Sequence, residues 1–263
     1  MNSRERVTLS LNHRQPDRVP FDLGGTVVSG MQASSVYLLR QALQLDAPGT
    51  PVKIIEPYQM LGEIAPDLVD ALGIDVLPLP GPRNMFGFES ANWKPWQLFD
   101  GTPVLVPERF NTQPEPNGDL LMYPEGDRSV PPSGRMPAGG YYFDAIIRQP
   151  PLEEDKLDPR DNLEEFGPIS DADLDHFARG AQRLWGETDK AVLANFGGTA
   201  FGDIALVPAP WLKHPRGIRD VAEWYISTAS RRDYVWAVFE RQCEIALQNL
   251  ARIHERVGEC VTA

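Results

Sequence analysis

The 263-residue sequence predicts an α/β fold in which short parallel strands alternate with covering helices. Two observations carry this prediction. Short runs of apolar and β-branched residues alternate along the chain with longer segments whose apolar residues recur at helical spacing. The tripeptide Gly-Gly-Thr also occurs twice, at 24–26 and 197–199, each time after an apolar run. A hairpin turn would need a second strand immediately afterwards, whereas each GGT precedes a segment of helical pattern.

The first part of the chain predicts helices and strands in alternation. Asn2 and Glu5 have the spacing of a capping box, so we expect a helix to begin there. The pattern then predicts a strand at 19–23, a helix at 29–45, a strand at 52–55, helical residues over 57–72 and a strand at 74–79. Pro66 interrupts the helical pattern and is expected to begin a second helix at its first turn, where proline is tolerated.

The composition changes after residue 79. Sixteen of the 25 prolines lie between Pro78 and Pro168. Two alternating runs, 102–106 and 119–123, lie in this stretch with turn-rich sequence between them, which predicts a hairpin or a small antiparallel sheet. We therefore interpret residues 80–165 as an insertion on a larger scaffold that spans residues 1–263.

The last part of the chain returns to the alternating pattern. Ser170 and Asp173 predict the start of a helix that runs to about Gly186. A strand follows at 191–196, then helices at 217–228 and 231–257, and 258–263 has the pattern of a further strand's beginning. Seven apolar residues of the long helix are spaced as one continuous stripe that should be buried. They are Val235, Phe239, Cys243, Ala246, Leu250, Ile253 and Val257.

Charge and composition exclude several kinds of protein. The formal net charge of −12 argues against nucleic-acid binding, which requires a basic face. Glu153 to Asp175 holds ten acids and two bases, and we interpret this segment as solvated surface, with an interaction surface as the alternative. No apolar run reaches the roughly 18 residues of a membrane helix. The charged N-terminus lacks a signal-peptide stretch, so we expect no membrane partner and a cytoplasmic location.

The candidate site lies where the strands end. Ligands of parallel sheets bind outside the carboxyl ends of the strands, so both GGT segments should lie on one face as tight loops beside a ligand. The alternative is that each doubled glycine is only a tight turn. The phosphate-loop, dinucleotide-loop and nucleophile-elbow patterns are absent. Cys243 and Cys260 form no C-x-x-C, and the four histidines are scattered, so the sequence predicts no metal site.

Several stretches of the sequence carry a resemblance to a known family. SRERV near the N-terminus, LNHRQPDRVP after it and DLGGT at 22–26 resemble the uroporphyrinogen decarboxylase superfamily, particularly its branch of corrinoid-dependent methyltransferases. ALGIDV at 71–76 resembles the family's second barrel strand and its approach, and NFGGTAF at 195–201 resembles the third strand and its loop. The resemblance covers nearly the whole chain apart from the proline-rich insertion.

The resemblance implies a partial (β/α)8 TIM barrel that carries the proline-rich, β-containing insertion, with its cavity at the carboxyl ends of the strands. It implies that residues 1–263 are the N-terminal part of that barrel. The implied activity is transfer of a methyl group between a corrinoid protein and a small-molecule acceptor. In that branch zinc is held by a His-x-Cys pair and a later Cys, and makes a thiol acceptor the reactive thiolate. No such pair occurs here, so the resemblance implies no cofactor within this chain and zinc ligands beyond Ala263.

Two other functions stay open. The first is a uroporphyrinogen decarboxylase, a lyase of porphyrin biosynthesis, which needs cations for the substrate's carboxylates and an acid facing the pyrrole N–H groups. The family places arginines just after the first strand, where this chain has GGTVVSG at 24–30, and an acid after the second strand, near Pro80-Gly81-Pro82. Asp75 lies at the wrong end of the strand to replace that acid, and Arg83 is the nearest cation. The second is an inactive truncated fragment that acts as a partner surface.

The residues that we predict to line the pocket belong to the two GGT loops. Their predicted role is to shape the pocket and to donate backbone N–H or hydroxyl hydrogen bonds, not to transfer protons. They are Gly24, Gly25, Thr26, Asn195, Gly197, Gly198 and Thr199. A half-barrel also leaves open strand edges and uncovered apolar side chains, which predict self-association of residues 1–263.

Overall fold

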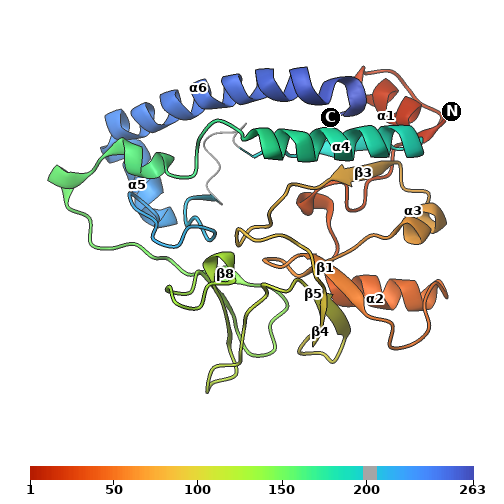
Figure 1. Cartoon of the computed structure of the whole chain (residues 1–263), viewed down its shortest axis with the longest axis horizontal. Coiled ribbons are helices and arrows are strands. Elements are labelled where there is room, and N and C mark those ends of the chain that lie inside the picture. The colour runs from red at the N-terminus through yellow and green to blue at the C-terminus, as the bar shows by residue number, and fades with distance from the viewer. Residues whose placement is uncertain (198–205) are drawn as a thin grey trace.

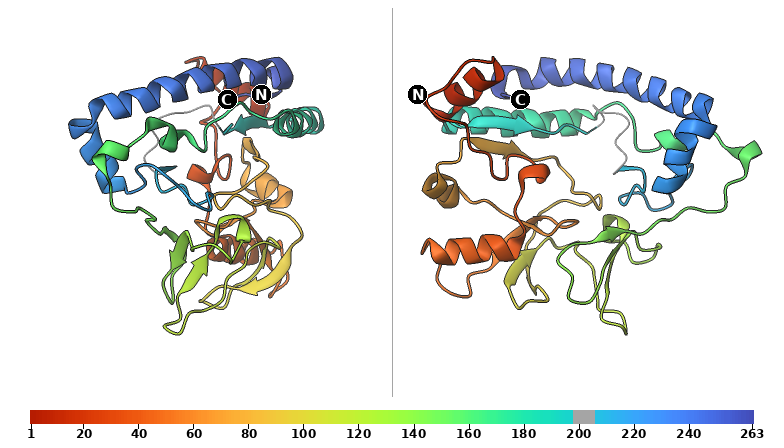
Figure 2. Two further views of the ribbon diagram at one scale, coloured as in Figure 1. Left: turned by 60° about the vertical axis from the view of Figure 1, so that its left-hand side comes forward. Right: turned by 180° about the vertical axis from the view of Figure 1, so that it is seen from behind.

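The computed structural model describes residues 1–197 and 206–263 and has a mixed α/β architecture (Figure 1). Its described strands form sheets of four, two and three strands, and no closed barrel is present among them. Helices α4 (Asp171–Glu187) and α6 (Arg232–Val257) run side by side above the two-stranded sheet, and the other two sheets lie on the opposite side of it (Figures 1 and 2). Within the described ranges, no helix has the length and apolar character needed to span a membrane.

The two-stranded sheet pairs β3 (Val76–Leu79) with β9 (Ala191–Ala194) in parallel. Val76 lies opposite Ala191 and Leu79 lies opposite Ala194. Both strands were predicted from the sequence. Because they are parallel and α4 lies between them in the chain, they form the strand–helix–strand unit that the alternating pattern predicts.

Two segments that the sequence predicts as strands, 19–23 and 258–263, lie beside this sheet but do not form strands. The N–H of Asp75 donates to the carbonyl of Phe21 at 2.9 Å, and the N–H of Thr262 donates to the carbonyl of Val192 at 2.8 Å. In the first segment Pro20 has no N–H, and the Phe21 N–H donates to the Asp75 side chain instead, so a ladder cannot form. In the second, 258–260 forms a 3-10 turn, so the strands predicted at 19–23 and 258–263 are both wrong as strands.

Helix α1 (Ser3–Leu11) is tied to the start of β3 through one buried carboxylate. Its capping box of Asn2 and Glu5 is present as predicted. The Asp75 carboxylate accepts from Ser3 Oγ at 2.8 Å, Arg6 Nη1 at 2.7 Å and Arg18 Nη1 at 2.7 Å. Burial raises the pKa of Asp75, but the hydrogen bonds that it accepts outweigh this and lower the pKa overall. Asp75 therefore anchors the amino end of β3, away from the carboxyl ends where a ligand would bind.

The helices α4 and α6, which cover β3 and β9, begin as the sequence predicts, but the buried face of α6 differs from the predicted one. The Ser170 hydroxyl accepts from the Asp173 N–H at 3.1 Å and caps α4. On α6 the predicted stripe is only partly buried, since Leu250 is 45% exposed and Cys243 is half-buried. The buried face is displaced because Asn249 lies within it and bonds the backbone N–H of Ile169 at 2.8 Å.

The acidic segment 153–175 packs against the C-terminal helices rather than facing only solvent. Helix α5 (Val221–Ser230) begins four residues later than predicted, capped by Asp220. Arginines around α5 and along α6 form ion pairs with acids of the segment, in the pairs Glu154–Arg231, Glu164–Arg216, Glu165–Arg219, Asp171–Arg252 and Asp175–Arg256. The Arg219 side chain is 0% exposed, so this contact is an internal interface of the chain.

The four-stranded sheet has the order β2-β1-β5-β4, and α2 (Ala33–Ala42) covers it. Its strands are β1 (Val52–Glu56), β2 (Leu61–Gly62), β4 (Lys94–Gln97) and β5 (Pro103–Val106). The helix predicted from 57 is wrong before Pro66, which begins α3 (Pro66–Leu72) at its first turn as expected. The chain turns after β1 because the Glu56 carboxylate accepts the N–H groups of Tyr58 and Gln59.

The three-stranded sheet contains β6 (Leu120–Met122), β7 (Gly134–Met136) and β8 (Asp144–Ala145), all antiparallel. The predicted hairpin between 102–106 and 119–123 is wrong, because β5 pairs with β1 and β4 while β6 pairs with β7. Residues 86–143 contribute aromatic side chains to the same hydrophobic core as α2 and β1. These are Phe86, Phe88, Phe110 and Phe143.

Candidate functional site

The first GGT loop lies over the face of the β3–β9 sheet that is turned away from α4 and α6. A Cβ atom placed on Gly25 would lie 2.8 Å from Val76 Cγ2 and 3.1 Å from Leu193 Cδ1, so the loop backbone rests directly on both strands. Leu79 and Val192 pack on the opposite side of the sheet, against α4 and α6. The loop therefore occupies the face of the sheet away from the helices, against Val76 of β3 and Leu193 of β9, and its place at the carboxyl ends of the strands stays a prediction.

At both Gly24 and Gly25 the surrounding atoms leave no room for a side chain. Gly24 has φ +80°, and a Cβ there would lie 2.7 Å from Ile64 Cγ1. At Gly25 a Cβ would lie 2.6 Å from Asp22 Oδ1, in addition to its contacts with the two strands. Both positions need a residue without a side chain, because the loop folds tightly over the sheet.

The polar groups of the loop bond to one another. The N–H of Gly24 donates to the Ser29 carbonyl at 2.9 Å, that of Gly25 to Asp22 Oδ1 at 2.9 Å, and that of Thr26 to Ser29 Oγ at 3.3 Å. Thr26 Oγ1 accepts from the Val28 N–H and caps the 3-10 helix η1 (Val27–Ser29). With these N–H groups occupied, the loop has no backbone donor ready for a ligand at residues 24–26, so of the predicted donors there the Thr26 hydroxyl is left.

The same hydrogen bonds hold two apolar side chains in solvent. Val28 is 92% exposed and Val27 is 45% exposed at the tip of η1. Neither the loop 24–30 nor its tip carries a charged residue. The first loop therefore presents an uncharged, apolar surface on the face of the β3–β9 sheet away from α4 and α6.

The second GGT lies only partly in the described residues. Asn195 and Gly197 are exposed beyond the end of β9, and a Cβ on Gly197 would meet no atom within 4 Å. Phe196 turns toward α4, with its ring 4.9 Å from that of Phe177. Gly198 and Thr199 lie outside the described residues. The structure thus brings the first GGT against Leu193, two residues before Asn195, and leaves Asn195 and Gly197 open beside it.

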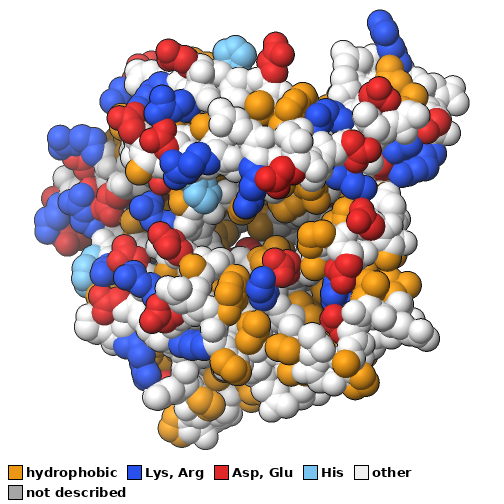
Figure 3. Space-filling model, turned by 45° about the vertical axis from the view of Figure 1, so that its right-hand side comes forward, with side chains coloured by type: hydrophobic (Ala, Val, Ile, Leu, Met, Phe, Trp, Pro, Cys, Tyr) orange, Lys and Arg blue, Asp and Glu red, His pale blue; other side chains and the backbone are white. Residues whose placement is uncertain are grey.

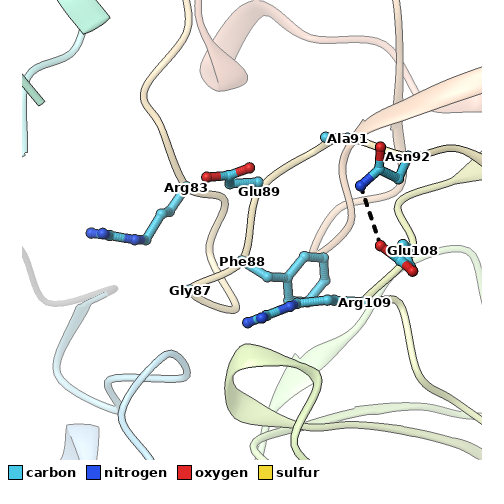
Figure 4. Close-up of a pocket in the computed structure, with 8 residues that line it drawn as sticks. All are labelled: Arg83, Gly87, Phe88, Glu89, Ala91, Asn92, Glu108 and Arg109. Carbon is cyan, nitrogen blue, oxygen red and sulfur yellow. Dashed lines mark hydrogen bonds between the residues drawn. The ribbon is translucent and has the colours of Figure 1, made fainter. Parts of the chain in front are cut away.

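A separate cavity of about 290 Å³ lies in the proline-rich stretch (Figure 4). Its lining residues come from the loops after β3 and β5 and are Arg83, Gly87, Phe88, Glu89, Ala91, Asn92, Glu108 and Arg109. Figure 3 shows one face of the molecule, which is hollowed near its centre between hydrophobic and charged side chains. Sequence reasoning singled out Arg83 alone. The charged residues that directly follow β5 were a signal that it missed.

Glu56 is a second group that the sequence analysis did not single out. It lies at the carboxyl end of β1 and is buried, and its carboxylate accepts only from the backbone N–H groups of Tyr58 at 2.9 Å and Gln59 at 2.7 Å. Burial raises the pKa of Glu56 more than these two hydrogen bonds lower it. The group is a buried carboxyl without a cationic partner in the described part of the chain.

The described residues hold no arrangement suited to a metal. Within 1–197 and 206–263, no three or more His, Cys, Asp or Glu side chains gather as metal ligands would. Cys243 and Cys260 are free and half-buried, and Cys260 packs against the core between β9 and α4. The resemblance places the zinc ligands beyond Ala263, so that zinc stays a prediction.

No protein-family model matches this chain, and neither does any curated protein or any solved structure.

Proposed function

We propose that residues 1–263 form the first part of a (β/α)8 barrel of the uroporphyrinogen decarboxylase superfamily. The order of neighbouring segments supports this proposal. Residues 19–23 lie beside β3, β3 pairs with β9, and residues 262–263 bond to β9, so four successive segments lie in sequence order. Helix α4 lies between the second and third segments in the chain, and α5 and α6 lie between the third and fourth. That is the order of consecutive strands in such a barrel.

The activity that we propose is transfer of a methyl group between a corrinoid protein and a small acceptor. The observation that carries it is the loop 24–30, which is closed by its own hydrogen bonds and presents Val27 and Val28 without any cation. A porphyrinogen with many carboxylates needs positive charge at this position, whereas a small, weakly charged acceptor can pack on apolar side chains. The role of the loop is to bind and orient the acceptor and to exclude water from it.

The proposal assigns no step to zinc, since the described residues do not form a zinc site. In this superfamily branch, bound zinc supplies a Lewis acid that lowers the pKa of the acceptor thiol. The residues described here contribute only the shape and the apolar character of the acceptor pocket.

Two parallel assays test the proposal. In the first, the protein is incubated with methylcobalamin and a panel of small thiols, and the methylated thiol is quantified by mass spectrometry. In the second, it is incubated anaerobically with uroporphyrinogen. We expect a methylated thiol and no coproporphyrinogen. Formation of coproporphyrinogen, or failure to methylate any thiol of the panel, would contradict the proposal.

A matched pair of valine variants tests whether the loop 24–30 contacts the acceptor. Val28 is 92% exposed and Val19, outside the loop, is 83% exposed, so an aspartate is tolerated by the fold at either position. Val28→Asp should raise the KM for the acceptor about tenfold, because one apolar contact with the acceptor is worth about 1–3 kcal/mol. Val19→Asp should leave the KM unchanged. Equal effects of the two substitutions would show that the loop does not contact the acceptor.

A further inference from the structure

The cavity in the proline-rich stretch is formed by the loops that follow β3 and β5. Residues 83–92 make one wall, and Glu108 and Arg109 make the other. Strand β5 is parallel to β1, and the cavity lies beyond its carboxyl end, where α/β sheets bind ligands. It is distinct from the loop 24–30 and does not depend on the function proposed for that loop.

Two arginines of the cavity have no acidic partner among the described residues. In the C-terminal part, Arg219 and Arg231 form ion pairs, whereas Arg179 on α4 has no ion pair among the described residues either. Arg83 and Arg109 line one cavity with their guanidinium groups unpaired. Their positive charge is therefore available to a ligand.

The acids of the same cavity, Glu89 and Glu108, form no ion pair with these arginines in the described part of the chain. Glu108, directly before Arg109, bonds Asn92 Nδ2 at 3.2 Å and turns toward it. In Figure 4, Arg83, Glu89 and Arg109 extend toward the same side of the cavity. The lining as a whole carries two cations and two anions, and the guanidinium groups of Arg83 and Arg109 are its hydrogen-bond donors for an anion.

The backbone that carries these side chains is held in place. The N–H of Asn84 donates to the Phe88 carbonyl at 3.0 Å, and that of Gly87 donates back to the Asn84 carbonyl at 2.9 Å. The Phe88 side chain is buried in the main core, and the Glu108 N–H donates to the Ala91 carbonyl at 3.1 Å. Ligand binding then costs only the ordering of the side-chain ends, which favours affinity.

The geometry points to a binding site for a small ligand with an anionic head group, a carboxylate or a phosphate, held between Arg83 and Arg109. A guanidinium group presents paired N–H donors that match the oxygen atoms of either head group. The volume of about 290 Å³ is close to the lower end for small-molecule sites, which excludes a large ligand such as a nucleic acid. Glu89 selects among anions by repelling the more highly charged ones.

Isothermal titration calorimetry with inorganic phosphate and with succinate tests this site and distinguishes the two head groups. Arg83→Gln and Arg109→Gln should each weaken binding of the preferred probe at least about tenfold, since each removes hydrogen bonds between a guanidinium group and the charged head group. Glu89→Gln should tighten it, because the repelling carboxylate is removed. Arg179→Gln, an exposed arginine on α4, is the matched control and should change nothing.

Each outcome decides the question. Binding of phosphate or of succinate, weakened by both cavity arginine variants and tightened by Glu89→Gln, supports the site and names its head group. Binding that Arg179→Gln weakens equally would be nonspecific attraction to surface charge and would overturn it. Absence of binding for both probes at about 10 mM would also overturn it, because a site of this kind should reach at least millimolar affinity. Circular dichroism of each variant confirms that its fold is intact.

Discussion

Replacing Gly25 by alanine tests whether the first GGT loop rests on the sheet as described. The new methyl group would lie 2.6 Å from Asp22 Oδ1, 2.8 Å from Val76 Cγ2 and 3.1 Å from Leu193 Cδ1. Carbon atoms at optimal contact are about 3.5–4.0 Å apart, so all three neighbours would have to move. Val76 cannot rotate away easily, because it is β-branched and buried in the core between α1 and α3.

The expected loss of stability follows from these contacts. Forcing a methyl group into a packed site costs about 1–3 kcal/mol. Moving Asp22 aside also breaks its hydrogen bond to the Gly25 N–H, worth about 0.5–1.5 kcal/mol. We therefore expect Gly25→Ala to lower the free energy of unfolding by about 2–3 kcal/mol, the greater part coming from overpacking.

The first glycine of the second GGT, Gly197, gives the control. A Cβ on Gly197 would meet no atom within 4 Å, so Gly197→Ala should change the free energy of unfolding by less than about 0.5 kcal/mol. Urea denaturation followed by circular dichroism measures both variants. A loss below about 0.5 kcal/mol for Gly25→Ala, or equal losses for the two, would show that the loop does not rest on β3 and β9.

Two further predictions concern buried charges. Arg219→Met should lower the free energy of unfolding, measured by urea denaturation, by about 3–5 kcal/mol, because it leaves the buried Glu165 carboxylate unpaired. Arg216→Gln, which changes an arginine that is 69% exposed, should lower it by no measurable amount. Similar stabilities of the two variants would refute the buried pair. Burial raises the pKa of Glu56 above its ordinary value of 4.5, so ionising it destabilises the fold as pH rises through that raised pKa. The unfolding free energy of Glu56→Gln minus that of the wild type should therefore increase with pH above 4.5 and then level off, and a difference independent of pH would contradict a buried Glu56.

The sequence by itself determined the elements whose signals are local. The capping box of Asn2, the Ser170 cap of α4 and the start of α3 at Pro66 all depend on residues within one helical turn, and all three are present. The approximate positions of β1, β3 and β9 were also predicted, from short apolar and β-branched runs bounded by polar residues, although similar runs at 19–23 and 258–263 form no strand. The doubled glycine at 24–25 likewise indicated a close backbone approach before its neighbours were known.

Only the tertiary structure decided which distant residues meet. Strand β5 pairs with β1, some 50 residues earlier, rather than with the nearer β6, and no local pattern records that choice. For the same reason the sequence placed Asn249 outside the buried face of α6, although its bond to the Ile169 N–H satisfies it there. Burial of a polar group depends on partners that the fold supplies, not on its position in a helical repeat.

The candidate sites, too, could be predicted from the sequence only in part. The two GGT motifs gave the position of the first loop, but only the structure decided that its N–H groups are occupied by Asp22 and Ser29 and that it presents valines. The cavity with Arg83 and Arg109 could not be predicted, because these residues are 26 positions apart and are brought together by β5. Loops and helix caps depend on residues that are near in the sequence and can be predicted from it. Which charged side chains lack a partner depends on contacts between distant residues, so only the structure shows it.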